Sequence, residues 1–580
     1  MDKKTLKHII DVAAGRKPAD LCIKNVDVVD VYNKEVFRSN VYVASGYIAG
    51  FGADDFPAAL TTVDATGKYM TPGFIDSHLH IESSHLSPCE YSRLVVPCGT
   101  TTVVADPHEI CNVCGTAGLD YMLKASEKLP LSIYYQFPSC VPCTPFEHSG
   151  AVLKADSVAK RIDNPRVMGL GELMDFYGVK NADLDILDKL IVCKNAGKII
   201  DGHSPGLSGT GLDAYSASGV KNDHECANAQ ELKDRIRRGM YVLVRQGTVC
   251  HDLVNLLKGV NANNAQWCLF CTDDCQAKTM LETGHIDNNV RMAIEEGLDP
   301  ISAICMATIN AATCFHMTDR GAIAPGMRAD FLLVSSLDKN MKVEDVYTAG
   351  NHVASNKKYL VETKHIQPPK SVSGRMKIKN LALENFALKL KSDKVVTIDV
   401  IPGSVVTAKG CAEIKRDENG FWRPDDQDIC KVAVLERHHG TGNVGLGLFS
   451  GFGLKGGAVA TTVAHDSHNC IVAGDNDADM LLAVQTLVEL GGGMAVVKGG
   501  KVLDSVQHEI AGLMTDIDGE TVAKKLANIQ NTAREQLCIH DDVDPFMTLC
   551  FMSLIVIPEI KITDTGLFDV IKYKFIPVEA

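Results

Sequence analysis

The sequence predicts an α/β protein built around a (β/α)8 TIM-like barrel. Short apolar strands alternate with helical stretches over residues 71–319, eight such strands can be counted, and β-rich pieces flank the segment on both sides. Alternation of this count and length fits a closed barrel better than an open sheet. The eight strand candidates are GFIDSHLH, TTVVADPHE, SIYYQFPSC, RVMGLGELM, KIIDGHSPG, GVKNDHE, MYVLVRQGT and WCLFCTDD.

The flanking pieces predict two further domains. Residues 1–70 open with an amphipathic helix and continue, like residues 320–365, with the alternating pattern of strands, so we expect one discontinuous β-sandwich domain that the barrel interrupts. Residues 366–580 have a pattern of their own, and we expect a separate α/β or α+β domain that covers the active site. The Gly-dense stretch 438–470 lacks a phosphate-loop motif and is interpreted as a region of tight turns.

Composition excludes several classes of partner. The net charge of −14 disfavours nucleic acid and anionic membrane, because their phosphates would be repelled. We find no apolar run of membrane-spanning length, and the first residues lack the apolar block of a signal peptide. The 20 cysteines are therefore expected to be reduced thiols in a cytoplasmic protein.

The first barrel strand ends in a pair of histidines, His78 and His80. Residues i and i+2 of a strand point to the same face, so both imidazoles should project together at the carboxyl end of the strand. Barrel enzymes place their chemistry at that end, and two imidazoles are ligands that a divalent metal accepts. A single HxH motif is weak evidence by itself.

Four more strand candidates end in a residue that can bind a metal. They are Glu172, His203, His224 and Asp273. Such a set could hold two divalent ions with Glu172 as the bridge, and the ions would make hydroxide available at neutral pH. Asp273 would then accept a proton and pass it to a leaving group.

With these residues in place, the chain resembles the amidohydrolase superfamily and, within it, the family of adenine deaminases. The matching stretches are PGFIDSHLHIESSHLSP, GTTTVVADPHEI, GLGELMDF, DGHSPGLSG, DHE, CTDD, GHID, GAIAPGMRADF and HDSHN. The resemblance implies two divalent ions, manganese first, with iron or zinc as alternatives. The implied ligands are His78, His80 and Asp273 for one ion, His203 and His224 for the other, and Glu172 as the bridge.

The implied reaction is the hydrolysis of adenine to hypoxanthine and ammonia in purine salvage, by a homodimer or larger oligomer. Attack on the ring needs a proton at the adjacent ring nitrogen, and Glu82, His108 and Glu109 are the candidates to supply it. The segment HDSHN is either a surface loop or a cover that brings His465, Asp466 or His468 to the substrate.

Other interpretations stay open or fail. Another hydrolase of the same superfamily, acting on cyclic amides or N-acyl groups, and a non-catalytic barrel scaffold are the alternatives. A cytidine-type deaminase needs H-x-E followed by P-C-x-x-C, and the chain offers His80-Ile81-Glu82 with Cys140 and Cys143. This interpretation fails, because those cysteines should open a helix and here they lie among prolines. A structural metal bound by Cys111, Cys114, Cys140 and Cys143 is a weaker interpretation than accidental spacing of the two pairs in a cysteine-rich chain.

Overall fold

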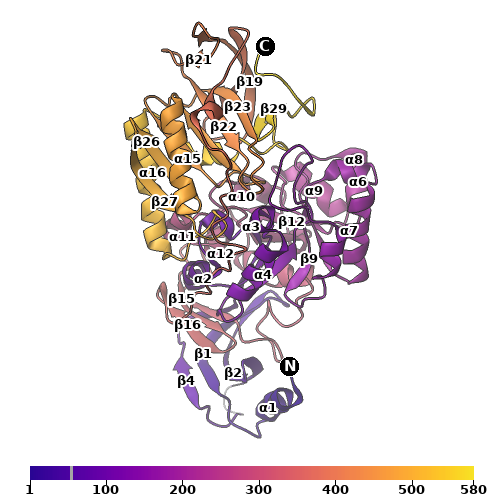
Figure 1. Cartoon of the computed structure of the whole chain (residues 1–580). Coiled ribbons are helices and arrows are strands. Elements are labelled where there is room, and N and C mark those ends of the chain that lie inside the picture. Colours follow the sequence, from indigo (N-terminus) through magenta and orange to yellow (C-terminus); the bar gives the residue numbers. More distant parts are fainter. Residues whose placement is uncertain (53–55) are drawn as a thin grey trace.

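The computed structural model describes residues 1–52 and 56–580. The chain forms three parts that follow one another along an elongated molecule (Figure 1). The β unit with the N-terminus lies at one end, the barrel lies in the middle, and the C-terminal domain lies against the barrel at the other end.

The middle part contains eight strands, and each overlaps one of the predicted segments. They are β6 (Phe74–Leu79), β7 (Thr100–Ala105), β8 (Ser132–Phe137), β9 (Val167–Leu173), β10 (Ile199–Gly202), β11 (Asn222–Asp223), β12 (Tyr241–Arg245) and β13 (Cys268–Cys271). They pair in parallel as a five-stranded arc, β6 to β10, and a three-stranded arc, β11 to β13. A parallel bridge between Leu79 and Asp273 joins the outer strands of the two arcs, so the strands form a barrel.

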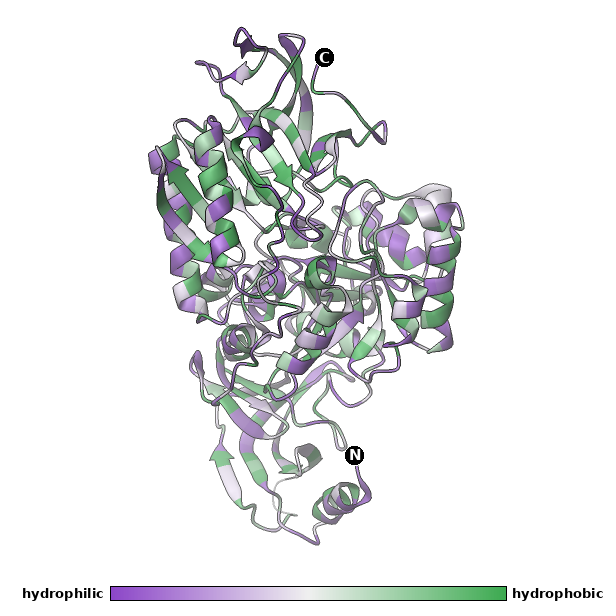
Figure 2. Ribbon diagram, in the orientation of Figure 1, coloured by the Kyte–Doolittle hydropathy of each residue, from purple (hydrophilic) through white to green (hydrophobic). Residues whose placement is uncertain are grey.

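Helices cover the outside of the barrel. Strands β6 and β7 are buried throughout, as expected for parallel strands with helices on one face and a packed interior on the other. The outer helices mix hydrophilic and hydrophobic turns (Figure 2). The apolar stretch 287–308 forms two helices, α12 (Ile286–Glu295) and α13 (Pro300–Met306), because Gly297 turns left-handed after the first and Pro300 starts the second.

The β unit combines both flanking pieces in one sheet. From the first piece come β1 (Leu21–Asp30), β2 (Glu35–Ala44), β3 (Tyr47–Phe51), β4 (Thr61–Asp64) and β5 (Tyr69–Pro72); from the second come β14 (Phe331–Val334), β15 (Val343–Thr348), β16 (Asn351–Ser355) and β17 (Lys358–Tyr359). All nine strands are connected by hydrogen bonds in one sheet, because β5 pairs with β1 on one side and β14 on the other. Helix α1 (Lys3–Ala13) packs on it, as the amphipathic start predicts.

The C-terminal domain consists mainly of strands, in an α+β arrangement. Its sheet contains β18 (Lys394–Val400), β19 (Thr407–Glu413), β22 (Ile429–Leu435), β23 (Val444–Ser450), β24 (Ala458–Thr461), β25 (Cys470–Gly474), β26 (Gly493–Lys498) and β27 (Lys501–Gln507). All pairs in this sheet are antiparallel except β18 with β23. The prediction of tight turns for 438–470 is only partly right: β23 and β24 run through it, and left-handed glycines at 451, 453 and 456 connect them.

Three helices complete the C-terminal domain, α15 (Asp477–Leu490), α16 (Gly519–Leu537) and α17 (Pro545–Cys550). Each starts with an acidic or amide side chain that accepts hydrogen bonds from the first turn, namely Asn476, Asp518 and Asp544. Among the residues described, no helix combines the length and the apolar character that crossing a bilayer requires.

Candidate metal centre and its cover

The centre is organised around the carboxylate of Glu172, which projects from β9. Its Oε1 lies 3.4 Å from Nε2 of His80 and 3.1 Å from Nδ1 of His108. Its Oε2 lies 2.7 Å from Nδ1 of His203 and 3.3 Å from Nε2 of His224. The two oxygens of one buried carboxylate therefore face two different pairs of imidazoles, which is the arrangement that a carboxylate shared by two cations needs.

Asp273 closes the same cluster from the opposite side. Its Oδ1 lies 3.2 Å from Nε2 of His80 and 3.8 Å from Nε2 of His78, while Oδ2 accepts a hydrogen bond of 3.1 Å from Arg245. The backbone of Asp273 is left-handed, with φ of 57°, a conformation that is uncommon for non-glycine residues but tolerated by Asp.

The histidines are oriented by groups behind them. Nδ1 of His80 donates a hydrogen bond of 2.9 Å to the carbonyl of Asp106, so its Nε2 keeps a lone pair for the centre. Nδ1 of His78 lies 3.3 Å from Asp201, and its buried Nε2 has no hydrogen-bond partner among the described residues. Donors held this way fit a divalent cation, and His78, His80 and Glu172 lie within 4.8 Å of one another.

A glycine makes the approach of Glu172 possible. The amide of Glu172 donates a hydrogen bond of 2.9 Å to the Asp106 carboxylate. A Cβ on Gly171 would lie 2.2 Å from that same carboxylate, so no other residue fits between them. The motif GLGELM thus supplies both the candidate ligand Glu172 and the space that orients it.

Electrostatics keep both carboxylates ionised. Burial alone would raise the pKa of Glu172, but hydrogen bonds from His108, His203 and His224 lower it well below the usual range. Burial likewise acts to raise the pKa of Asp273, and His80, His224 and Arg245 together lower it well below the usual range. The centre is therefore a site for positive charge.

The three candidates for ring protonation occupy different places. His108 lies directly between Glu172 and the C-terminal domain. Glu82 is buried, its Oε1 accepts a hydrogen bond from the amide of Ile110, and its Oε2 has no partner among the described residues. Burial and the charge of Glu109 raise the pKa of Glu82. Oε1 of Glu109 lies 3.0 Å from the hydroxyl oxygen of Ser83, whose single proton points to the nearer carboxylate of Asp274.

The HDSHN segment lies over this cluster. Oδ1 of Asp466 lies 3.7 Å from Nε2 of His108, and Nε2 of His468 lies 3.5 Å from Oε2 of Glu109. The amide of Ala464 donates to Nδ1 of His468, so the neutral ring carries its proton on Nε2, toward Glu109.

The segment is held firmly from behind. The guanidinium of Arg437 donates to the carbonyl of His468, and Nε2 of His438 donates a hydrogen bond of 2.8 Å to the carbonyl of Ser467. Asn469 donates a hydrogen bond of 2.8 Å to the carbonyl of His148 in the barrel. Residues 463–474 are all buried, so the segment is a fixed cover of the barrel mouth.

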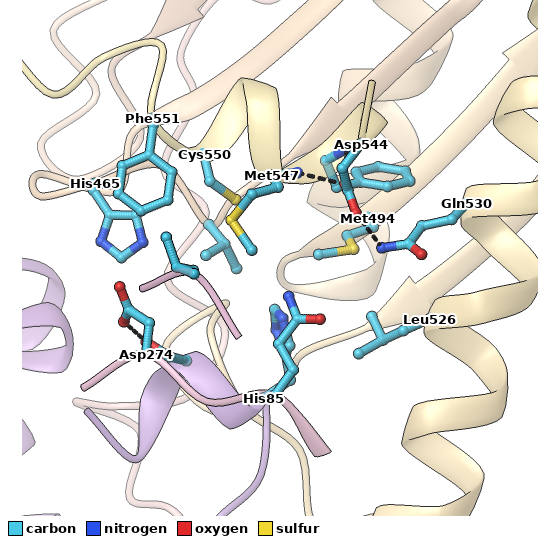
Figure 3. A pocket seen from close by; sticks show the side chains of 15 residues that line it. His85, Asp274, His465, Met494, Leu526, Gln530, Asp544, Met547, Cys550 and Phe551 are labelled. Atoms are coloured by element: carbon cyan, nitrogen blue, oxygen red, sulfur yellow. Dashed lines mark hydrogen bonds between the residues drawn. The ribbon is translucent and has the colours of Figure 1, made fainter. Parts of the chain in front are cut away.

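A cavity lies beside the centre, between the barrel and the C-terminal domain (Figure 3). The barrel lines it with loop residues that follow β6, β12 and β13, including Ser83 and Asp274, the direct neighbours of Glu82 and Asp273. The C-terminal domain lines it with residues of the cover, α16 and α17. His465 belongs to both the cover and the cavity wall.

The cysteines of the two C-x-x-C pairs have different local surroundings. All 20 are free thiols. Cys111 packs in the apolar core, whereas Cys114 contacts the carbonyl of Val372. Cys140 accepts a hydrogen bond from Ser139, and Cys143 lies 4.0 Å from the sulfur of Met174.

Sequence reasoning missed the residues that orient the ligands. Asp201 stands two positions before His203, the same i, i+2 spacing that drew attention to His78. Glu225 follows His224 directly and lies 3.4 Å from its ring, and Arg245 ends β12 and contacts Asp273. Strand-end position was a usable signal for each of them, but it does not separate a ligand from its support.

Comparison with known proteins agrees with this geometry. Residues 69–353 match the amidohydrolase family, and residues 404–574 match the adenine deaminase C-terminal domain. The chain is 52% identical to "Adenine deaminase 2" of Desulfotalea psychrophila over 100% of both chains. It is 47% identical to an adenine deaminase of Nitratidesulfovibrio vulgaris over 99% of both, and 46% identical to that of Ligilactobacillus salivarius over 100% of both.

Solved structures of low sequence identity match a part of the chain. A β-aspartyl dipeptidase from Fervidobacterium islandicum is 16% identical with a TM-score of 0.46, and covers 59% of this chain and 99% of its own. An enamidase described as a member of the amidohydrolase superfamily is 19% identical with a TM-score of 0.43, and covers 58% of this chain and 96% of its own.

Proposed function

The chain belongs to the adenine deaminase family of the amidohydrolases and is a hydrolase that acts on adenine. From this we propose how its side chains carry out the deamination of adenine to hypoxanthine and ammonia. The observation that carries the proposal is the division of the Glu172 carboxylate between two pairs of imidazoles. The family generally binds a divalent metal, and the clustered histidines and aspartate can hold one.

We assign two ions to the centre, with manganese as the first expectation and iron or zinc as alternatives. His78, His80 and Asp273 would hold one, His203 and His224 the other, and Glu172 would lie between them. His108 is as close to Glu172 as His80 is, so it is available to either the metal or the substrate. When bound, such ions supply a nucleophilic water at neutral pH and stabilise developing negative charge.

Asp273 is proposed to move the proton. It is ionised, buried and fixed by Arg245, so it can take a proton from the attacking water and deliver it to the departing amino group. Arg245 also contacts Glu225, which places the guanidinium as a rigid support rather than a mobile group.

Glu82 is proposed to protonate the ring nitrogen next to the reacting carbon. Oε2 is buried and without a hydrogen-bond partner among the described residues in both Glu82 and Glu109, but that of Glu109 faces Nε2 of His468 at 3.5 Å. Burial and the charge of Glu109 raise the pKa of Glu82, so Glu82 keeps a proton that it can donate. His108 then serves to hold the substrate side of Glu172 in place, with Asp466 behind it. His465, Asp466 and His468 form the cover that keeps bulk water from the reaction.

The remaining proposals concern the substrate, the oligomeric state and the cellular compartment of the enzyme. Adenine is the substrate, the net charge of −14 disfavours nucleic acid as a main partner, and the enzyme is proposed to form a homodimer or larger oligomer. The 20 free thiols support a reducing cytoplasm. The deamination of adenine is proposed to serve purine salvage.

The test is turnover of purified enzyme reconstituted with manganese. Loss of adenine and gain of hypoxanthine, followed by ultraviolet absorbance with stoichiometric ammonia, is the expected result. N-acylated and cyclic-amide substrates test the alternative that the enzyme is another hydrolase of the superfamily. The metal content of the purified protein tests the alternative of a non-catalytic scaffold, which would contain no stoichiometric divalent ion. Release of product only from the control substrates would overturn the proposal.

A further inference from the structure

The cavity between the barrel and the C-terminal domain has two kinds of wall. One wall is made of rings and sulfur atoms, with Phe551, Met547 and Cys550 from α17 and the segment after it and Met494 from β26 (Figure 3). The other is polar and comes from the barrel loops, with Asp274 and Ser83. Flat, apolar walls with a polar edge are the surroundings that a planar heteroaromatic ring prefers.

The ring wall is held in a fixed orientation. His465 and Phe551 stack with centroids 4.7 Å apart and an angle of 21° between their planes. The amide of His465 donates a hydrogen bond of 2.8 Å to the carbonyl of Cys550, which ties the cover to α17. The stacked pair is therefore preformed and can offer the outer face of one ring, at the end of the cavity where Figure 3 also places Asp274.

Asp274 supplies a hydrogen-bond acceptor on the opposite side. The hydroxyl of Ser83 donates a hydrogen bond to Oδ1 of Asp274. The backbone carbonyl of Asp274 accepts a hydrogen bond of 2.9 Å from the amide of Thr248, so both the side chain and the backbone of Asp274 are held in place. The other oxygen, Oδ2, has no hydrogen-bond partner within residues 1–52 and 56–580. Asp274 directly follows Asp273, so a ring that touches it is also next to the centre.

The chemistry of adenine limits what Asp274 can bind. The free base offers two kinds of N–H donor, the exocyclic amino group and the N–H of its imidazole ring. The amino group is replaced in the reaction and must face the centre. The donor left for a carboxylate in the cavity wall is the ring N–H, which a purine substituted at N9, such as a nucleoside, does not have.

We propose that this cavity is the pocket for the purine base and that Asp274 selects the free base by accepting its ring N–H. The proposal rests on the proposed function, because it takes adenine as the substrate. Phe551 and His465 form the stacking surface, which serves any purine equally. Asp274 is the residue that distinguishes adenine from its N9-substituted forms, and Ser83 positions it.

The experiment compares kcat/KM for adenine and for 9-methyladenine in the manganese-loaded enzyme. The wild type should prefer adenine strongly, and Asp274→Asn should reduce that preference by about 10- to 100-fold, the effect of losing a hydrogen bond to a charged group. Phe551→Leu should raise KM for both compounds and leave the ratio unchanged. Glu520→Gln, at an exposed position of α16 that does not line the cavity, is the matched control and should alter neither.

Binding of hypoxanthine, measured by calorimetry, gives a readout apart from turnover, and metal content shows whether each variant keeps its centre. An unchanged ratio in Asp274→Asn with intact metal would overturn the assignment of the pocket while leaving the proposed function standing. A wild type that neither converts adenine nor binds hypoxanthine would instead overturn the proposed function.

Discussion

Oδ1 of Asp466 lies 3.7 Å from Nε2 of His108, and the other nitrogen of that ring lies 3.1 Å from Glu172. One imidazole of the barrel thus connects the C-terminal domain to the centre. Burial alone would lower the pKa of His108, but Asp466 and Glu172 raise it well above the usual range. The C-terminal domain is therefore part of the site and not only a neighbour of it.

Asp466→Asn tests this connection. The amide keeps the size of the side chain but removes the charge beside His108, so we expect kcat to fall by about 10- to 100-fold, the usual effect of removing a group that orients a ligand. Metal content and melting temperature should stay close to wild type. Asp426→Asn, an exposed aspartate of the same domain, is the control. Full activity in Asp466→Asn would show that the cover acts without this contact.

Glu172→Gln tests the shared carboxylate. An amide offers one oxygen and one NH2 group, so it cannot face two cations with two oxygens. We expect the variant to lose at least one of two metal equivalents, measured by elemental analysis, and activity to fall by more than about a thousand-fold. Glu418→Gln on the surface should behave as wild type. Two retained equivalents in Glu172→Gln would contradict the bridging role.

Asp273→Asn separates proton transfer from metal binding. The amide oxygen can still face the centre, but it cannot accept and return a proton at neutral pH. We expect turnover to fall by about a hundred- to ten-thousand-fold while metal stays bound. The measurement pairs kcat with metal content in the same sample. Normal turnover would remove Asp273 from the proton pathway, and loss of metal would make it mainly a ligand.

The strands of the barrel could be predicted because each is a short apolar run that ends in a polar residue. Parallel strands buried on both faces read as continuous apolar segments, and their carboxyl ends meet at one mouth. Position at a strand end therefore sufficed to bring His78, Glu172 and Asp273 together in the prediction. The continuous stretch of residues 287–308 divides into two helices because glycine and proline act on the backbone locally.

What could not be predicted depends on contacts between distant segments. Nothing local in HDSHN shows that Asp466 reaches His108, since the contact is set by how β24 and β25 place the loop between them. The single nine-stranded sheet is likewise a matter of pairing, because β5 has one partner from each flanking piece. The pairing of strands that are distant in the sequence determines these features, and the intrinsic propensity of each strand does not reveal its partners.

The final prediction concerns a buried charge far from the reaction. Lys561 in β28 (Ile560–Thr563) is fully buried, and its Nζ donates a hydrogen bond of 2.8 Å to the carbonyl of Val405. No carboxylate within the described residues forms an ion pair with it. Burial therefore lowers the pKa of Lys561 from 10.5 to about 7.

The sign of the pH dependence follows from linkage. Below about pH 7 both the folded and the unfolded chain carry the proton, and the folded state bears the full cost of a buried charge. Between pH 7 and 10.5 only the unfolded chain binds the proton, so this group makes the wild type more stable as pH rises through that window. Lys561→Met has no such proton, and it loses one hydrogen bond worth about 1 kcal/mol.

We therefore expect Lys561→Met to melt a few degrees above the wild type near pH 7, with the difference shrinking steadily toward pH 10. Thermal unfolding of both proteins across this range is the measurement, and the difference between the curves cancels the titration of all other groups. Lys572→Met, an exposed lysine nearby in the chain, should give a difference that does not change with pH. Parallel curves for Lys561→Met and the wild type would mean that the amine keeps its proton when buried, through water or a shift of Val405.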